Sequence, residues 1–66
     1  MKVTYDGKTD TLTMLLKEDA TIVDSDEHTD GLILDFDERG EVVSIEVLEA
    51  SRRVTEARKV EFKAAD

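Results

Sequence analysis

The sequence predicts a small α+β domain, with an antiparallel sheet of β-hairpins, one short C-terminal helix and a final strand. Apolar residues recur at every second position over most of the chain, which is the period of a β-strand. Two turn signals, Asp6-Gly7 and Arg39-Gly40, separate these alternating runs. The chain has 66 residues and contains neither proline nor cysteine. A chain of this length forms one domain, which we assign to residues 1–66.

The first hairpin is predicted over residues 2–16, on both sides of the Asp-Gly turn. A short run with β-branched residues at 20–23 predicts a third strand. The acidic segment 24–30 has an irregular pattern and is predicted to form a loop. The apolar side chains that alternate along the first hairpin are Val3, Tyr5, Leu12, Met14 and Leu16.

The second hairpin is predicted over residues 31–48, with Gly40 supplying the positive φ of a tight turn. This hairpin is expected to form the centre of the core. Alternation places six apolar residues on one face, where we expect them to be mainly buried: Leu32, Leu34, Phe36, Val43, Ile45 and Val47.

The tail after residue 48 allows two interpretations. Ser51 is a candidate N-cap for a short helix near residues 49–54. Val60 and Phe62 then alternate with charged residues, which favours a final strand. Small and apolar residues in the tail also recur at helical spacing, so one helix through the whole tail is the alternative. That helix would leave Phe62 off its apolar face, and we therefore favour the short helix followed by a strand.

The charge of the chain is −8 and is concentrated in its middle. Residues 18–49 carry twelve carboxylates and one arginine. Such a surface repels nucleic acid and attracts a basic protein partner. No apolar run approaches the roughly 20 residues of a membrane helix, and the N-terminus lacks the apolar segment of a signal peptide. We therefore expect no nucleic-acid or membrane partner and a cytoplasmic location.

Several segments together resemble a family of small prokaryotic proteins, the domain of unknown function 2283 family. They are the opening Val3-Thr4-Tyr5-Asp6, the strand end Leu34-Asp35-Phe36-Asp37 before Gly40, and the junction Ile45-Glu46-Val47-Leu48-Glu49-Ala50-Ser51. Arg39 departs from the family, whose members commonly carry a carboxylate or Asn there. The resemblance implies an α+β domain built mainly of hairpins, with no established activity. Its suspected association with toxin-like genes suggests an antitoxin-like role.

Two acidic motifs are candidates for a metal site. Asp35, Asp37, Gly40 and Glu46 follow most of the spacing of a calcium-binding loop. Arg39, however, places a cation where that loop needs an oxygen ligand, and the flanking segments are predicted strands rather than helices. Strand geometry should separate these carboxylates, so we expect a charged β-turn that binds no calcium tightly.

The second acidic motif is the segment 24–30, which contains His28 among four carboxylates. With a single histidine and no oriented ligands, we interpret it as a solvated acidic loop. No serine has a flanking motif that would activate it as a nucleophile. We therefore predict no cofactor, no metal site and no enzymatic activity.

The sequence favours a non-enzymatic protein-interaction module, and an antitoxin-like neutraliser of a basic partner is the specific form that we expect. A structural homo-oligomeric domain and a weak metal or small-ligand binder are the alternatives. A core of this size contributes only roughly 3–5 kcal/mol, which favours self-association as a homodimer. Apolar residues opposite the main core face, together with two arginines, are the predicted interface: Leu15, Ile33, Val42, Leu48, Arg52 and Arg53.

Overall fold

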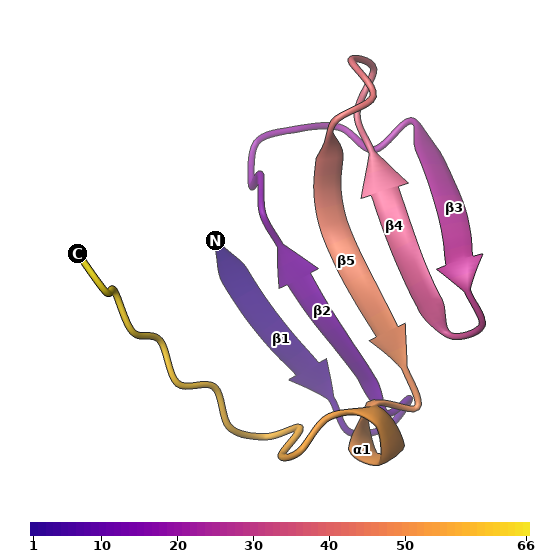
Figure 1. The fold of residues 1–66 in the computed structure, drawn as a ribbon. Coiled ribbons are helices and arrows are strands. Elements are labelled where there is room, and N and C mark those ends of the chain that lie inside the picture. The colour runs from indigo at the N-terminus through magenta and orange to yellow at the C-terminus, as the bar shows by residue number, and fades with distance from the viewer.

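The computed structural model describes all residues from Met1 to Asp66 and shows one five-stranded antiparallel sheet (Figure 1). The strand order is β1-β2-β5-β4-β3, so the last strand in the sequence lies at the centre of the sheet. A single helical turn, α1, follows the sheet. The elements are β1 (Lys2–Asp6), β2 (Thr11–Leu15), β3 (Asp24–Thr29), β4 (Leu32–Phe36), β5 (Val42–Leu48) and α1 (Ala50–Arg53). The fold is mostly β, so the predicted α+β class holds only because this short helix is present.

Both predicted hairpins form. β1 pairs with β2 across the Asp-Gly turn, and β4 pairs with β5 across the turn that contains Gly40. Gly40 has a φ of 79°, a conformation that glycine adopts without steric strain. Asp37 closes the same turn, since its Oδ1 accepts hydrogen bonds from the backbone N–H groups of Arg39 and Glu41. The turn predicted as charged and glycine-dependent is therefore confirmed.

The third strand lies later in the sequence than predicted. Residues 20–23 form no strand, and the acidic segment Asp24–Thr29 pairs with β4 at the edge of the sheet. Every residue of β3 is exposed. An edge strand needs no apolar alternation, and charged side chains protect it from pairing with other chains. The acidic composition that indicated a loop is therefore also compatible with an edge strand.

A β-bulge interrupts the pairing of β4 with β5. Asp35 pairs with Ser44, whereas Phe36 pairs with Val42, so Val43 is the extra residue of β5. The carbonyl of Val43 accepts hydrogen bonds from Leu16 and Lys17, which extends the contact between β2 and β5. The bulge changes the alternation on which the sequence prediction relied, because Val42 now lies beside Phe36 in the ladder.

The short helix occurs where it was predicted, but Ser51 is not its N-cap. Glu49 holds the N-cap position in the left-handed conformation, and its own side chain makes no capping hydrogen bond. Ser51 instead donates its hydroxyl to Asp10 at 2.6 Å, and Asp10 also accepts from the Ser51 backbone N–H. The Tyr5 hydroxyl is a third donor to Asp10, at 2.6 Å. Asp10 therefore fastens α1 to the first hairpin.

The predicted final strand is not formed. Residues 54–66 lie outside helices and strands; Val54 and Ala57 are half-buried near Leu12, and the end of the tail extends away from the sheet on the β1 side (Figure 1). Phe62 is 80% exposed and Val60 61% exposed, so their alternation with charged residues does not reflect burial against the sheet. The helix alternative for the whole tail is also wrong.

Candidate functional site

The two faces of the sheet differ sharply in chemistry. The strand registers pair apolar residues of neighbouring strands with one another, so these side chains lie on the same face, which we call the apolar face. The opposite face, which we call the polar face, carries serine, threonine and carboxylate side chains. The apolar face consists of Val3, Tyr5, Leu12, Met14, Leu32, Leu34, Phe36, Val42, Ile45 and Val47.

Most of the apolar face has no second layer, and only the start of the tail lies against it, where Val54 and Ala57 line a cavity with Leu12. Figure 1 shows one sheet with α1 at one end and the tail outside β1. The only buried apolar side chains are Val43 and Ala50, which are 1% and 0% exposed. The residues of the second hairpin that we expected to be mainly buried are, apart from Val43, only half-buried. The predicted core is therefore an open surface in the single chain.

The polar face holds the one buried charged residue, Asp35, which is 2% exposed. The Ser25 hydroxyl donates to its Oδ1 at 2.6 Å, and the Ser44 hydroxyl donates to its Oδ2 at 2.6 Å. These residues come from three neighbouring strands, β3, β4 and β5. Glu46 shares a further hydrogen bond with Asp35. We call Asp35 and Glu46 the carboxyl pair.

The pKa values of the two members of the carboxyl pair are shifted in opposite directions. The hydrogen bond to Asp35, burial and the Asp35 charge raise the pKa of Glu46 to about 7. Burial raises the pKa of Asp35, but hydrogen bonds from Glu46, Ser25 and Ser44 outweigh it and lower that pKa below its usual value. The pair therefore carries one proton, held on Glu46, at mildly acidic pH.

The carboxyl pair corrects one part of the sequence analysis. Strand geometry was expected to separate the carboxylates of the calcium-like motif, yet it brings Asp35 and Glu46 together diagonally across β4 and β5. The Gly40 turn alone would set Asp35 opposite Val43, but the bulge at Val43 shifts the register, sets Asp35 opposite Ser44 and so brings it close to Glu46. Both Asp35 oxygens already accept serine hydroxyls. The pair is thus a satisfied internal network.

The acidic segment 24–30 distributes its side chains over both faces of the sheet. Asp24 and Asp26 pair with Phe36 and Leu34 and so lie on the side of the apolar face. Glu27 lies on the other side and accepts a hydrogen bond from the backbone N–H of Gly31. No group of three or more His, Asp or Glu side chains lies close enough to hold a metal ion.

The residues predicted as an interface do not form one continuous surface. Leu15 and Ile33 lie on the polar face, beside Ser44 and Glu46. Leu48 also lies on the polar face, opposite Thr11 at the end of β2, whereas the bulge places Val42 beside Phe36 on the apolar face. Arg52 forms an ion pair with Glu49, and Arg53 donates to the Asp30 carbonyl at 2.6 Å.

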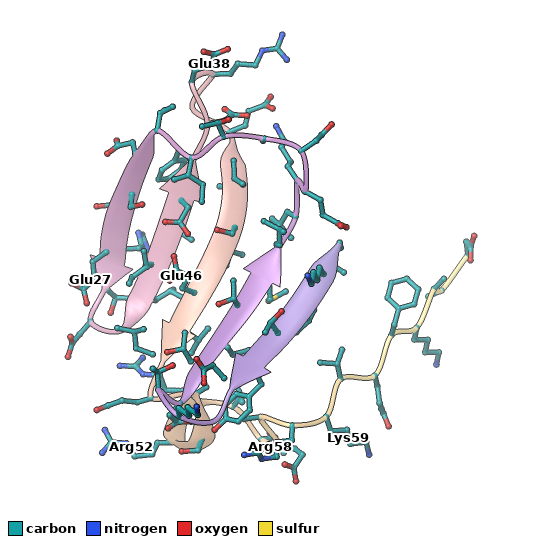
Figure 2. All side chains as sticks on the ribbon, turned by 180° about the vertical axis from the view of Figure 1, so that it is seen from behind. Glu27, Glu38, Glu46, Arg52, Arg58 and Lys59 are labelled. Atoms are coloured by element: carbon teal, nitrogen blue, oxygen red, sulfur yellow. The ribbon has the colours of Figure 1, made fainter.

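Charge is distributed unevenly across the molecule. In Figure 2, Glu27 lies at the β3 edge, whereas Arg58 and Lys59 lie on the tail beyond the opposite edge. Lys17 forms ion pairs with Asp37 and Glu41, and other ion pairs involve Glu18, Glu49 and Glu61. Six exposed carboxylates of the middle segment have no cation partner within the chain: Asp19, Asp24, Asp26, Glu27, Asp30 and Glu38.

The comparison with protein families agrees with this fold. The family model described as "Protein of unknown function (DUF2283)" matches residues 2–51. The chain belongs to the DUF2283 family. The match spans all five strands and the start of α1, so it contains both faces of the sheet and the carboxyl pair. The resemblance noted in the sequence is therefore confirmed.

Searches of curated proteins and of solved structures gave no match to this DUF2283 chain. Family membership thus supplies no activity, and only the geometry of the chain can support a functional proposal. None of its helices is long and apolar enough to cross a membrane.

Proposed function

We propose that this DUF2283 chain is a non-enzymatic protein-interaction module of the cytoplasm. The observation that carries this proposal is the uncovered apolar face of a single-layer sheet. Domains bury the apolar side of a sheet against a second layer, and large exposed apolar patches on soluble proteins mark interaction surfaces. Another protein chain is therefore the natural second layer.

A non-enzymatic role is supported by the state of the polar groups. Catalysis needs a nucleophile or general base with an oriented partner at an open site. The most perturbed groups of this chain, Asp35 and Glu46, bond to each other and to two serine hydroxyls. Their hydrogen-bonding capacity is thus directed inward rather than toward a substrate.

The partner that we propose in addition is a small basic protein, which the chain neutralises as an antitoxin does. The six exposed carboxylates without a cation partner support this choice, and three of them, Asp24, Asp26 and Glu27, lie on the edge strand β3. Clustered charge of one sign accelerates association with a partner of opposite sign. A surface with these charges favours a cationic protein over nucleic acid.

Co-expression tests the proposal. The tagged chain is produced together with the small protein encoded beside its gene and captured from the lysate, and native mass spectrometry identifies the complex. We expect a complex that weakens at high salt and in the variant Asp24→Asn/Asp26→Asn/Glu27→Gln. The matched control is Glu38→Gln, which removes an exposed carboxylate from the distant β4–β5 turn. A complex equally strong in all three proteins and at high salt would contradict a charge-driven partner.

A further inference from the structure

We infer that the apolar face is covered by the same face of a second copy, with the twofold axis parallel to the strands. In this dimer the β1 edge of one copy lies over the β3 edge of the other. The inference rests on the proposed function, because it names the chain that completes the interaction module. In this dimer the apolar face serves self-association, whereas the acidic groups outside the interface remain free to bind the basic partner.

The composition of the apolar face supports a second copy as its occupant. The sheet presents apolar side chains on β1, β2, β4 and β5, while β3 contributes Asp24 and Asp26 to the same side. A twofold axis along the central strand β5 brings this surface against itself, so the apolar side chains of β2, β5 and β4 meet those of β4, β5 and β2 in the second copy. Two sheets that pack in this way lie about 10 Å apart, with their side chains interdigitated.

The size of the face sets the expected strength of the dimer. Five strands spaced by about 4.8 Å, with a rise of about 3.4 Å per residue, give a face of roughly 24 Å by 20 Å. Each copy then covers about 500 Å², or about 1,000 Å² in total, which is near the lower limit for a specific interface. We therefore expect a dimer that dissociates on dilution through the micromolar range.

The two edges of the sheet differ in charge, because β3 is acidic whereas β1 and the tail together carry equal numbers of cationic and acidic side chains. At the β3 edge, Asp24 and Asp26 project from the apolar side and have no cation partner. At the β1 edge, the guanidinium of Arg58 lies over the Tyr5 ring, 5.0 Å from its centroid. The tail that continues from Arg58 also carries Lys59 and extends outside β1 (Figures 1 and 2).

These edge charges select one of the two face-to-face arrangements. An axis across the strands would place β3 over β3 and bring Asp24 and Asp26 against their own copies. An axis along the strands separates the acidic strands and places β3 under the partner's β1 edge, where Arg58 lies over Tyr5, one row from the position that faces Asp26. Like charges across an interface oppose association, whereas complementary charges set its orientation. The strand-parallel axis is therefore favoured.

The strand registers show which residues of the two copies would face each other under each axis. Val3, Met14, Ile45, Leu34 and Asp26 form one continuous row across the sheet, from β1 to β3. Ile45 lies at the centre of the row, on the central strand β5. With the axis along β5, Val3 of one copy faces Asp26 of the other. With the axis across the strands, Val3 faces Val3.

Cysteine cross-linking tests the arrangement, and the chain contains no natural cysteine. Val3→Cys and Asp26→Cys proteins are mixed and treated with a short bis-maleimide. We expect the mixed Val3–Asp26 product to dominate over both self-linked products. Thr4→Cys is the matched control, because its side chain lies on the polar face and should give no product. Dominant Val3–Val3 linkage would overturn the strand-parallel axis.

Sedimentation velocity across a dilution series from about 1 to 100 μM provides the second measurement, over the range expected for an interface of this size. We expect wild type to shift from monomer to dimer, and Ile45→Lys to raise Kd by about 100-fold or more. Thr4→Lys, on the polar face, should leave Kd within about twofold. If Ile45→Lys does not fold, as judged by circular dichroism, the cross-linking result decides.

The inference would be overturned if the wild-type chain stayed monomeric throughout and the mixture of Val3→Cys and Asp26→Cys proteins gave no product above the Thr4→Cys control. The co-expression experiment is independent of this result. A monomeric chain that still captures a basic partner would retain the proposed function while losing the dimer. A dimer that captures no basic partner would do the reverse.

Discussion

Replacing Glu46 with Gln tests whether the carboxyl pair makes stability depend on pH. The pKa of Glu46 rises from 4.5 to about 7 on folding, so the folded chain binds this proton more tightly than the unfolded chain does. The stability from this group is complete at low pH and is lost as pH rises through 7. The linkage relation gives a loss of up to about 2–3 kcal/mol between about pH 5 and about pH 8. That is a large share of the stability of a 66-residue domain.

The Gln side chain should remove this loss. Its amide can donate the hydrogen bond to Asp35 at every pH, so Glu46→Gln should match wild type near pH 5. Near pH 8 we expect the variant to be more stable by up to about 2–3 kcal/mol. Urea unfolding at fixed protein concentration measures both proteins, and Glu38→Gln is the control because that carboxylate is exposed. Parallel pH profiles for wild type and Glu46→Gln would refute the shared proton.

Three other perturbations follow from local geometry. Gly31→Ala should destabilise by about 1–2 kcal/mol, because a Cβ there would lie 2.7 Å from the Arg53 guanidinium at a φ of 82°; Gly40→Ala, with nothing within 4 Å, should lose less in the same urea titration. Asp10→Ala should release α1, since it removes the acceptor of two hydrogen bonds from Ser51; faster amide exchange in α1 would show this, and unchanged protection would contradict it. Deleting residues 59–66 should leave the thermal midpoint unchanged, because Phe62 and Val60 are exposed; a clear drop would show that the tail packs on the sheet.

The hairpins could be predicted because local signals determine them. Alternating apolar residues and the turn at Gly40 specify β4 and β5 without reference to the rest of the chain. The position of β3 could not be predicted in this way. Its residues contact only one neighbouring strand and are fully exposed, so no burial pattern distinguishes them from a loop.

The strand predicted in the tail was wrong for the opposite reason, because there the local pattern was present and the partner strand was missing. Val60 and Phe62 alternate as a strand would, but a strand also needs a partner, and single-sequence periodicity contains no information about pairing. The carboxyl pair could not be predicted either. Asp35 lies opposite Ser44 only because of the bulge at Val43, and the contribution of Ser25 from β3 required a strand whose position the sequence did not reveal.

The strand order also has a consequence for how the chain folds. Three of the four strand pairs are hairpins between consecutive strands, whereas β2 and β5 are distant in sequence. The chain can therefore form β1–β2 and the meander β3–β4–β5 separately, with low loop-closure entropy. Joining β2 to β5 is the one step that closes a long loop, and long-range contacts of this kind limit folding rates. The β2–β5 junction is thus the natural line along which the sheet divides into two units, and cleavage of the connection at residues 16–23 would yield one fragment on each side of it.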